Sequence, residues 1–396
     1  MTLIIASFAL LAAEAAKLPG EDALRQVEAD DSVEVSLLTC APGREVYSLY
    51  GHTAIRYKDY RNGMDMVVNY GVFSFKKPFF ILRFIFGLTD YEMGIMPFDQ
   101  FCEEYKIEGR KVVQQTLNLT TAEKEAIAEA LQKNYQPENR TYRYNYFYDN
   151  CTTRARDMIL SHINGTVRYT GGKSEYPSYR QAIHLFNEEY PWARFGNDIL
   201  LGVKADAHTS REEYQFLPFN LMNDFNNALV TRADGKAVPL VTGQSDIVLS
   251  GITGRSFTFP LRPLACAWIF FALVSMATAA EAWRRKRCVA VDAVLMALDG
   301  CAGLLIFTMF FSQHPTTSTN LHILLLNPLP LFFIHRIVKM AKSGRPSKFW
   351  IYAIISIAAF LIGGFFQDYA EGTYILALSL LVRCVWNITP FKTEKC

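Results

Sequence analysis

The fold is decided by one stretch of the chain, residues 146–157, which reads YFYDNCTTRARD. Aromatic residues alternate before Cys151 as in a strand, and the residues after it have helical spacing. This order places the Cys151 thiol on the first turn of a helix, directly after a strand. Unpaired backbone N–H groups at that end stabilise an anion, and Arg154 and Arg156 act in the same direction. The stretch therefore predicts a reactive thiolate.

The best candidate for a general base lies far upstream, at His52. This histidine opens an alternating segment, residues 52–57, after the turn residue Gly51. A histidine on a strand and a cysteine at a helix start form the pair used by thiol acyl-transfer enzymes. Isolated cysteines and histidines are more often packing residues. The polar Asp149 and Asn150 before the thiol make a poor core environment, which favours the catalytic interpretation.

Hydrophobicity divides the 396 residues into two parts. Residues 17–260 have the composition of a soluble domain rich in Tyr and Phe, whereas residues 261–396 contain a succession of apolar segments. Residues 1–16 are apolar and end in small residues, which predicts a signal peptide. Their start lacks a positive charge, so an uncleaved anchor is the alternative. The net charge of +2 excludes a nucleic-acid partner bound through bulk charge.

Several apolar segments of the second part have about the 20 residues that a membrane helix needs. They are residues 263–282, 289–311, 321–340, 349–366 and 373–388, so an all-α membrane domain of five spans is expected. Basic residues follow the first, third and fifth segments, whereas the other two connections contain neither Lys nor Arg. The positive-inside rule therefore predicts a protein of the inner membrane with a cytoplasmic C-terminus and an exported N-terminal part.

The eight cysteines do not form a disulfide framework. Cys40, Cys102 and Cys151 lie in the exported part, and a Cys40–Cys102 disulfide is a hypothesis that would leave Cys151 free. The Cys and His spacings predict no metal site, and the chain has no glycine-rich phosphate loop. We therefore expect neither a metal nor a cofactor.

Short strands precede the cysteine helix in the exported part. Alternation predicts them at residues 33–38, 46–50, 52–57, 66–72, 112–119 and 142–148. Thr120 to Glu123 has the form of a capping box, which predicts a helix that runs to about Asn134. Residues 176–230 are expected to be mostly helical, and residues 231–260 to contain short strands. This order favours an α+β domain around an antiparallel sheet.

Aromatic residues also gather between residues 73 and 91, with Lys and Arg interspersed. The segment is too short and too charged to span a bilayer, but its composition suits an interfacial helix or loop. Packing on the domain's own core is the alternative interpretation. Phe79, Phe80 and Phe84 are the residues of this segment that we expect to contact lipid.

The motifs resemble those of the NlpC/P60 superfamily, and in particular its permuted, lecithin:retinol acyltransferase-type branch, in which His precedes Cys. The matching residues are Gly51-His52, Asn69-Tyr70-Gly71 and Asn150-Cys151. This likeness implies a papain-like fold. Over nearly its full length, the chain is similar to the Bacteroidota-type lipoprotein N-acyltransferases (Lnb). That similarity rests on residues 50–56, 69–73, 148–154, 314–315 and 327–329.

The Lnb resemblance implies a transfer of an acyl chain from a phospholipid, through a Cys151 thioester, to the N-terminal amine of a diacylglyceryl-cysteine lipoprotein. His52 is then the base, and Asn69 orients its imidazole. Asn69 departs from the lecithin:retinol branch, which often has His at this position. The oxyanion is expected to be held or supported by Asn150, Tyr50 and Arg154.

Polar residues between the second and third spans, His314 and Asn320, are expected to bind lipid or acceptor, unless they are ordinary interface residues. Three other functions remain open. A cysteine peptidase or amidase of the cell wall needs a polar groove, which the aromatic segment and five spans argue against. A phospholipase A shares the first half-reaction but uses water as the acceptor. A membrane scaffold would not need Cys151.

Overall fold

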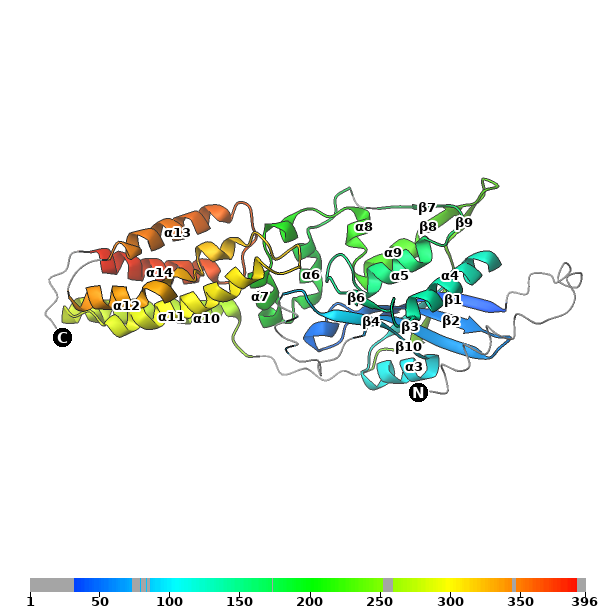
Figure 1. Cartoon of the computed structure of the whole chain (residues 1–396), viewed down its shortest axis with the longest axis horizontal. Coiled ribbons are helices and arrows are strands. Elements are labelled where there is room, and N and C mark those ends of the chain that lie inside the picture. The colour runs from blue at the N-terminus through cyan, green and yellow to red at the C-terminus, as the bar shows by residue number, and fades with distance from the viewer. Residues whose placement is uncertain are drawn as a thin grey trace, which may run out of the picture.

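The computed structural model describes residues 32–72, 79, 83, 86–172, 174–251, 259–343 and 347–389. The molecule is elongated, with a bundle of apolar helices at one end and a domain built on a β-sheet at the other (Figure 1). The expected signal peptide, residues 1–16, lies outside the described residues, as do Phe80 and Phe84.

Within the described residues, a seven-stranded antiparallel sheet forms the centre of the N-terminal domain. Its strands lie in the order β10-β5-β1-β2-β3-β4-β6. Consecutive strands β1 to β4 are therefore neighbours, and β6 extends the edge beyond β4. The bounds are Val33–Cys40 (β1), His52–Asp59 (β2), Met64–Val72 (β3), Asp90–Pro97 (β4), Val112–Leu117 (β5), Thr141–Arg143 (β6) and Val241–Val248 (β10).

Helices cover both faces of this sheet. Helix α3 (Phe98–Ile107) contributes to a core cluster that contains Leu38 and Val67. On the opposite face, Leu37 and Val68 pack in the cluster that includes residues of three other helices, α4 (Thr121–Tyr135), α5 (Cys151–Leu160) and α9 (Pro218–Asn226). Because successive strand residues point to opposite faces, the adjacent apolar pairs Leu37-Leu38 and Val67-Val68 each serve both cores.

The remaining elements of this domain lie beside the sheet and toward the bundle. Helices α6 and α7 stand between the sheet and the apolar helices (Figure 1). Strands β7, β8 and β9 form a second, three-stranded sheet within the described residues. The bounds are Val46–Ser48 (η1), Thr166–Tyr169 (β7), Tyr179–Asn187 (α6), Pro191–Leu200 (α7), Val203–Asp206 (η2), Arg211–Tyr214 (α8), Ala228–Thr231 (β8) and Ala237–Pro239 (β9).

Most of the expected elements are confirmed, including the capping box of Thr120 and Glu123 at the start of α4. The strand expected at residues 46–50 is wrong: a 3₁₀ helix lies there, and Gly51 turns the chain with a φ of 82°. A Cβ at Gly51 would lie 2.6 Å from the Cys40 carbonyl oxygen, so this turn requires glycine. The aromatic strand expected at residues 142–148 pairs only over β6.

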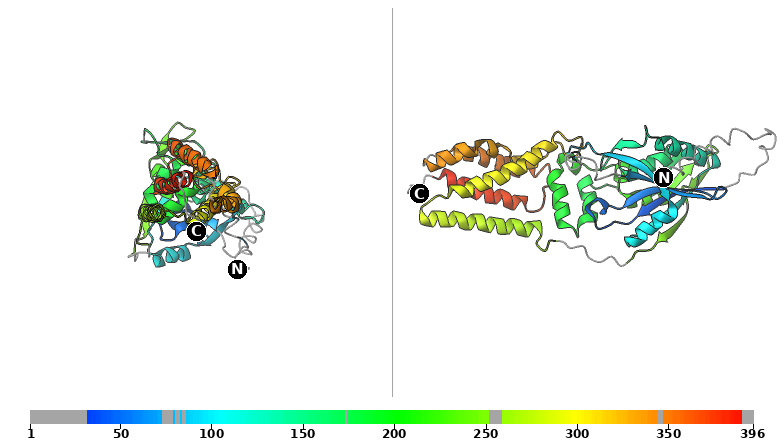
Figure 2. Two further views of the ribbon diagram at one scale, coloured as in Figure 1. Left: turned by 90° about the vertical axis from the view of Figure 1, so that its left-hand side faces the viewer. Right: turned by 60° about the horizontal axis from the view of Figure 1, so that its bottom comes forward.

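The C-terminal part is a bundle of helices that run roughly along the long axis of the molecule (Figure 2). Among the described residues, three helical segments are long and apolar enough to cross a bilayer: Pro263–Arg284, Val289–Met309 and Leu321–Lys342. The other two apolar helices, Phe349–Gly363 and Thr373–Ile388, are shorter, so five spans stay a prediction. The bundle bounds are Pro263–Arg284 (α10), Val289–Met309 (α11), Leu321–Leu324 (η3), Leu329–Lys342 (α12), Phe349–Gly363 (α13) and Thr373–Ile388 (α14).

A buried ion-pair cluster joins α10, α11 and α14. The Arg383 guanidinium contacts Glu281 at 3.1 Å and Asp292 at 2.8 Å, and Asn387 donates a hydrogen bond to Asp292. All four side chains are buried. Removing one partner of such a cluster leaves an uncompensated charge, which typically costs about 3–5 kcal/mol. The cluster therefore fixes which faces of the three helices meet.

Candidate active site

The three side chains expected to form a catalytic group meet at the ends of two strands and one helix. His52 is the first residue of β2, Asn69 lies on β3 and Cys151 is the first residue of α5. Asn69 is the register partner of Ala54, and His52 lies two residues from Ala54, so both side chains are on one face of the sheet. His52 Nε2 donates a hydrogen bond to Asn69 Oδ1 at 3.0 Å. The Nδ1 atom is therefore the nitrogen that remains for the Cys151 thiol.

The N-cap of α5 fixes the position of the thiol. Asn150 Oδ1 accepts hydrogen bonds from the backbone N–H groups of Thr152 and Thr153, at 2.8 and 2.9 Å. The Thr153 hydroxyl accepts in return from the Asn150 N–H at 2.9 Å, which completes a capping box. The Cys151 N–H has no acceptor among the described residues, so it is available to stabilise negative charge beside its own sulfur.

The electrostatics favour an ion pair between Cys151 and His52. Burial opposes the charged form of each group, but the two groups stabilise each other's charge more strongly. The nearby thiolate and the Asn69 hydrogen bond thus raise the pKa of His52 above its ordinary value. The imidazolium, the Thr53 backbone N–H and the Thr152 hydroxyl lower the pKa of the Cys151 thiol. These shifts are those that a nucleophile and its base require.

Asn150 and Tyr50, two of the residues expected to support the oxyanion, make structural hydrogen bonds instead. Both amide hydrogens of Asn150 are engaged, with the carbonyl oxygens of Tyr146 and Phe216, each at 2.9 Å. Its side chain is therefore a helix cap rather than an oxyanion donor. Tyr50 is buried, and its hydroxyl accepts hydrogen bonds from Asn187 and Asn197. This geometry ties Tyr50 to α6 and α7.

Arg154, the third expected support residue, holds the approach to the thiol in place. Its guanidinium makes a two-fold contact with Asp149, through Nε at 2.6 Å and Nη2 at 2.8 Å. The same group lies over the Tyr142 ring, 3.5 Å from its centre. Arg154 thus joins the segment before the helix to β6 and positions an aromatic ring next to the site.

Tyr142 is a residue that the sequence did not single out. A Cβ built on Gly71 would lie 3.8 Å from the Tyr142 hydroxyl and 3.9 Å from Cys151 Cβ, so the hydroxyl and the Cys151 side chain border the same point. This hydroxyl is buried and has no hydrogen-bond partner among the described residues. Burial and the nearby thiolate raise the pKa of Tyr142, so the phenol keeps its proton. A buried, protonated hydroxyl without a partner is a hydrogen-bond donor available to a ligand.

The residues expected to bind lipid differ in their exposure to solvent. Asn320 is fully buried, and the head-group role does not fit it because its side chain contacts Ile199, His322 and Gln367. His314 is partly buried in the same connection. Phe79 is 76% exposed, which suits a lipid contact, while Phe80 and Phe84 lie outside the described residues.

The hypothesised Cys40–Cys102 disulfide is absent from the described residues. Both cysteines are buried free thiols, as part of the core cluster beside α3. Burial raises the pKa of Cys40 to about 12, and the pKa of Cys102 is also raised by burial. These thiols are therefore poor nucleophiles at neutral pH, in contrast to Cys151.

Loops at one end of the bundle hold the N-terminal domain. The Gly202 N–H donates to the Thr316 carbonyl oxygen at 2.8 Å, and Gln367 Nε2 donates to the Leu201 carbonyl oxygen at 3.1 Å. Trp192 Nε1 donates to the Leu261 carbonyl oxygen at 2.8 Å. A Cβ at Gly202 would lie 2.4 Å from the Ser318 carbonyl oxygen. The backbone at Gly202 and the backbone at Ser318 therefore approach too closely for any residue other than glycine at position 202. The thiol domain is thus fixed against the bundle.

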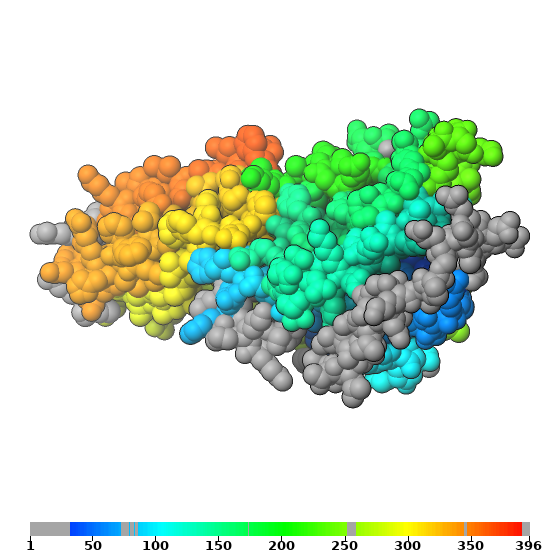
Figure 3. All heavy atoms as spheres, turned by 45° about the vertical axis from the view of Figure 1, so that its right-hand side comes forward, coloured from blue at the N-terminus to red at the C-terminus, as the bar shows by residue number. Residues whose placement is uncertain are grey.

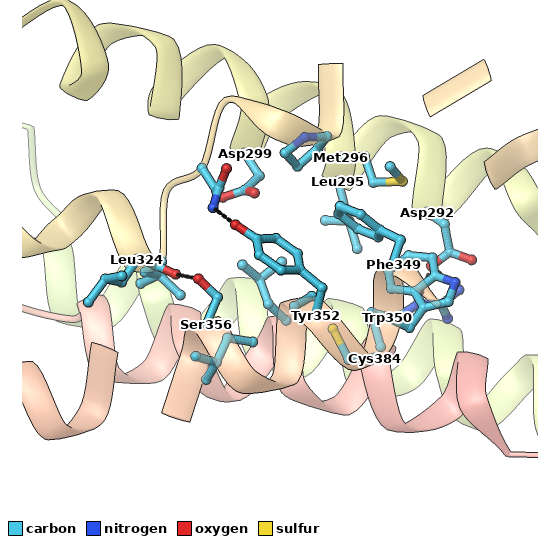
Figure 4. A pocket seen from close by; sticks show the side chains of 17 residues that line it. Asp292, Leu295, Met296, Asp299, Leu324, Phe349, Trp350, Tyr352, Ser356 and Cys384 are labelled. Carbon is cyan, nitrogen blue, oxygen red and sulfur yellow. Dashed lines mark hydrogen bonds and ion pairs between the residues drawn. The ribbon is translucent and has the colours of Figure 1, made fainter. Parts of the chain in front are cut away.

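A cavity of about 50 Å³ lies within the bundle, among α11, α13, α14 and the chain before α12 (Figure 4). Asp299 borders it next to Asn327, which donates a hydrogen bond to the Tyr352 hydroxyl at 2.7 Å. Ser356 donates to the Leu324 carbonyl oxygen at 2.6 Å. All residues that line this cavity belong to the bundle, so it is separate from Cys151 and His52.

A cysteine–histidine pair on a sheet domain, fixed to one end of an apolar helix bundle, defines a membrane protein with its reactive group outside the bundle. Family models match both parts. The Lnb N-terminal periplasmic domain matches residues 21–184, and the Lnb transmembrane domain matches residues 254–395. The chain belongs to the Lnb family. Its N-terminal part is therefore periplasmic, and membership suggests an acyltransferase of lipoprotein maturation. No curated protein and no solved structure matches the chain.

Alkylation of the cysteines tests the ion pair. Because the pKa of Cys151 is lowered, we expect iodoacetamide to modify it at a pH below that needed for an ordinary thiol. His52→Ala removes the stabilising charge and should shift the pH profile of Cys151 upward. The exposed Cys288 is the internal control, measured in the same peptide digest. A Cys151 profile that is the same with and without His52 would contradict the ion pair.

Proposed function

We propose that this protein is a lipoprotein N-acyltransferase that uses Cys151 as its nucleophile. The observation that carries the proposal is the Cys151–His52–Asn69 group, held in a periplasmic domain that is fixed to a membrane bundle. The donor would be a phospholipid, and the acceptor the N-terminal amine of a diacylglyceryl-cysteine lipoprotein. The family supports the lipoprotein substrate and the membrane context.

In the first half-reaction, Cys151 Sγ attacks an ester carbonyl carbon of the phospholipid. The carbonyl oxygen gains the negative charge, and the Cys151 N–H and the Tyr142 hydroxyl would donate hydrogen bonds to it. When the C–O bond breaks, protonated His52 gives its proton to the leaving alkoxide, and a lysophospholipid departs. Asn69 holds the imidazole at Nε2 throughout, so Nδ1 is the atom that transfers the proton.

In the second half-reaction, the acceptor amine attacks the thioester carbonyl carbon. Neutral His52 takes the proton that the amine loses, and the C–S bond breaks to release the Cys151 thiolate beside the imidazolium. The product carries an amide-linked acyl chain, and the initial ion pair is restored. Each half-reaction uses the same donors to the oxyanion, so one site serves both steps.

The orientation in the membrane follows from the ends of the helices. The connections 312–320 and 364–372 contact the periplasmic domain, whereas Arg284–Arg287, Lys339, Lys342 and Lys348 belong to the opposite end of the bundle. We therefore propose an inner-membrane protein with a signal peptide at 1–16, a thiol domain at 17–260 with a papain-like fold, and five spans in 261–396 that end in the cytoplasm.

Fusions to the C-terminus test this orientation. Alkaline phosphatase attached after Cys396 should be inactive, because it needs the periplasm to fold, whereas a fluorescent protein at the same site should fluoresce. Fusions inside the 312–320 connection are the matched controls and should give the opposite pattern. An active phosphatase at the C-terminus would contradict an odd number of spans.

Label transfer tests the proposed activity. We would incubate the purified protein in detergent with an acyl-labelled phospholipid and a diacylated lipopeptide, and follow the label by mass spectrometry. We expect the label on the peptide amine with wild type and with the control Cys288→Ser, but not with Cys151→Ser or His52→Ala. Label that appears only as free fatty acid would instead show a phospholipase A. If the amine stays unlabelled and no fatty acid is released, the remaining candidate functions are a cell-wall amidase and a membrane scaffold.

Removal of the Tyr142 hydroxyl tests its role as a donor to the oxyanion. Tyr142→Phe should slow acylation of Cys151 by about 100-fold or more, as loss of one oxyanion donor does in other enzymes. The control is Tyr70→Phe, because the Tyr70 hydroxyl is already occupied by Asn134 Oδ1 at 2.8 Å. The measurement is the rate of thioester formation. Equal rates for Tyr142→Phe and wild type would contradict the role.

A further inference from the structure

Helix α7 is amphipathic in the opposite sense to an ordinary surface helix. Within this fully described helix Asp198 alone is buried, and its carboxylate forms an ion pair with the buried Arg180 of α6 at 3.1 Å. Trp192, Phe195 and Ile199 recur at the spacing of one helical face, and none of these three is buried. The charged side of α7 thus faces the protein, and its apolar side faces outward.

The outward side of α7 adjoins open space and continues onto the chain before α10. Gly196 lies one turn after Trp192 on this side, and a Cβ at Gly196 would meet no described atom within 4 Å. The Trp192 ring packs edge-on against the Phe259 ring, with the ring centres 5.9 Å apart, and its Nε1 donates to the Leu261 carbonyl oxygen. Phe259 and Leu261 are both exposed. We define the α7 patch as Trp192, Phe195, Ile199, Phe259 and Leu261.

The α7 patch lies at the level where the chain enters the bundle. Leu261 comes two residues before Pro263, the first residue of α10, and the domain before α10 is periplasmic. Helix α10 has 22 residues and is therefore about 33 Å long, close to the thickness of about 30 Å of a hydrocarbon core. The Pro263 end of α10 then marks the periplasmic boundary of that core. Trp192, held to Leu261, lies at the depth of the lipid head groups.

The orientation of α7 is that of an interfacial helix. The bundle helices run along the long axis of the molecule, whereas the green helices α6 and α7 stand across this axis in the right-hand view of Figure 2. A helix that is perpendicular to membrane-spanning helices lies parallel to the bilayer surface. In Figure 3 the yellow and orange atoms of the bundle lie directly against the periplasmic domain. Tryptophan and phenylalanine on one side of such a helix are typical of the boundary between head groups and acyl chains.

We propose that the α7 patch is inserted into the head-group region of the periplasmic leaflet and anchors the thiol domain on the lipid surface. The Trp192 N–H already has an acceptor in Leu261, so the ring enters apolar surroundings without an unpaired donor. On the protein side of α7, Asn197 donates to the Tyr50 hydroxyl at 2.6 Å, and Tyr50 lies two residues before His52. The helix that contacts lipid therefore also positions the start of β2. This lipid contact is independent of the reaction that the thiol catalyses.

Quenching of tryptophan emission by brominated phospholipids tests this contact. The full-length protein is placed in nanodiscs whose phospholipids carry bromine either near the glycerol or near the methyl end of the acyl chain. The difference between wild type and Trp192→Phe isolates the emission of Trp192, and Trp268→Phe isolates that of an exposed tryptophan further inside α10. We expect Trp192 to lose more emission to bromine near the glycerol than to bromine near the methyl end, and Trp268 to respond more to the deeper bromine than Trp192 does. Trp192 emission that aqueous iodide quenches and both brominated lipids leave unchanged would overturn the proposal.

Photo-crosslinking at Gly196 is a second measurement, which does not depend on the folding of Trp192→Phe. Benzoylphenylalanine in place of Gly196 enters open space, so the helix accommodates it. Illumination in phospholipid nanodiscs should add the mass of one phospholipid to the protein. The same probe at the exposed Leu264 of α10 is the positive control, and the probe at the exposed Tyr60, about 26 Å from His52 along β2, is the negative control. If the probe at Gly196 gives no lipid adduct while the probe at Leu264 does, or if it captures a second copy of the chain instead, the lipid contact is wrong.

Discussion

The hydrogen bonds of Asn150 determine where the reactive group lies. Its carbonyl oxygen caps α5, and its amide holds Tyr146 and Phe216, so the first turn of the helix is tied to the chain on both sides. Because Cys151 is the next residue, the thiol is directed to the end of the helix with the free N–H groups. His52 completes the arrangement by supplying the opposite charge, and the pKa values of both groups shift accordingly.

The second constraint is the close junction between the thiol domain and the bundle. Backbone groups of residues 199–203 bond directly to the loops at the periplasmic end of the bundle, with Asn320 and Gln367 as buried connectors. This junction also holds β6 against Gln313 through Arg143. Tyr142, the proposed donor to the oxyanion, precedes Arg143 on that strand, so this contact also helps to hold Tyr142 in place.

Local patterns predicted much of this structure. The alternation of β1 to β3, the capping box of α4 and the helix start at Cys151 are properties of short stretches, so the sequence revealed them directly. The position of Tyr142 beside Cys151 was not predictable from the sequence. It depends on the pairing of β6 with β4, and these two strands are far apart in the chain. The burial of Asn320 and the Arg383 cluster were missed for the same reason: sequence shows that these residues are polar but not what they contact.

Trapping the acyl-enzyme is the most direct test of the central claim that Cys151 carries the acyl chain. We would incubate the protein with a phospholipid alone, digest it and determine the mass of the Cys151 peptide with and without hydroxylamine, which cleaves thioesters. The account predicts the mass of one acyl chain on Cys151 that hydroxylamine removes and that disappears on addition of a diacylated lipopeptide. An acyl chain on another residue, or an unmodified Cys151 in a protein that still N-acylates the peptide, would contradict it.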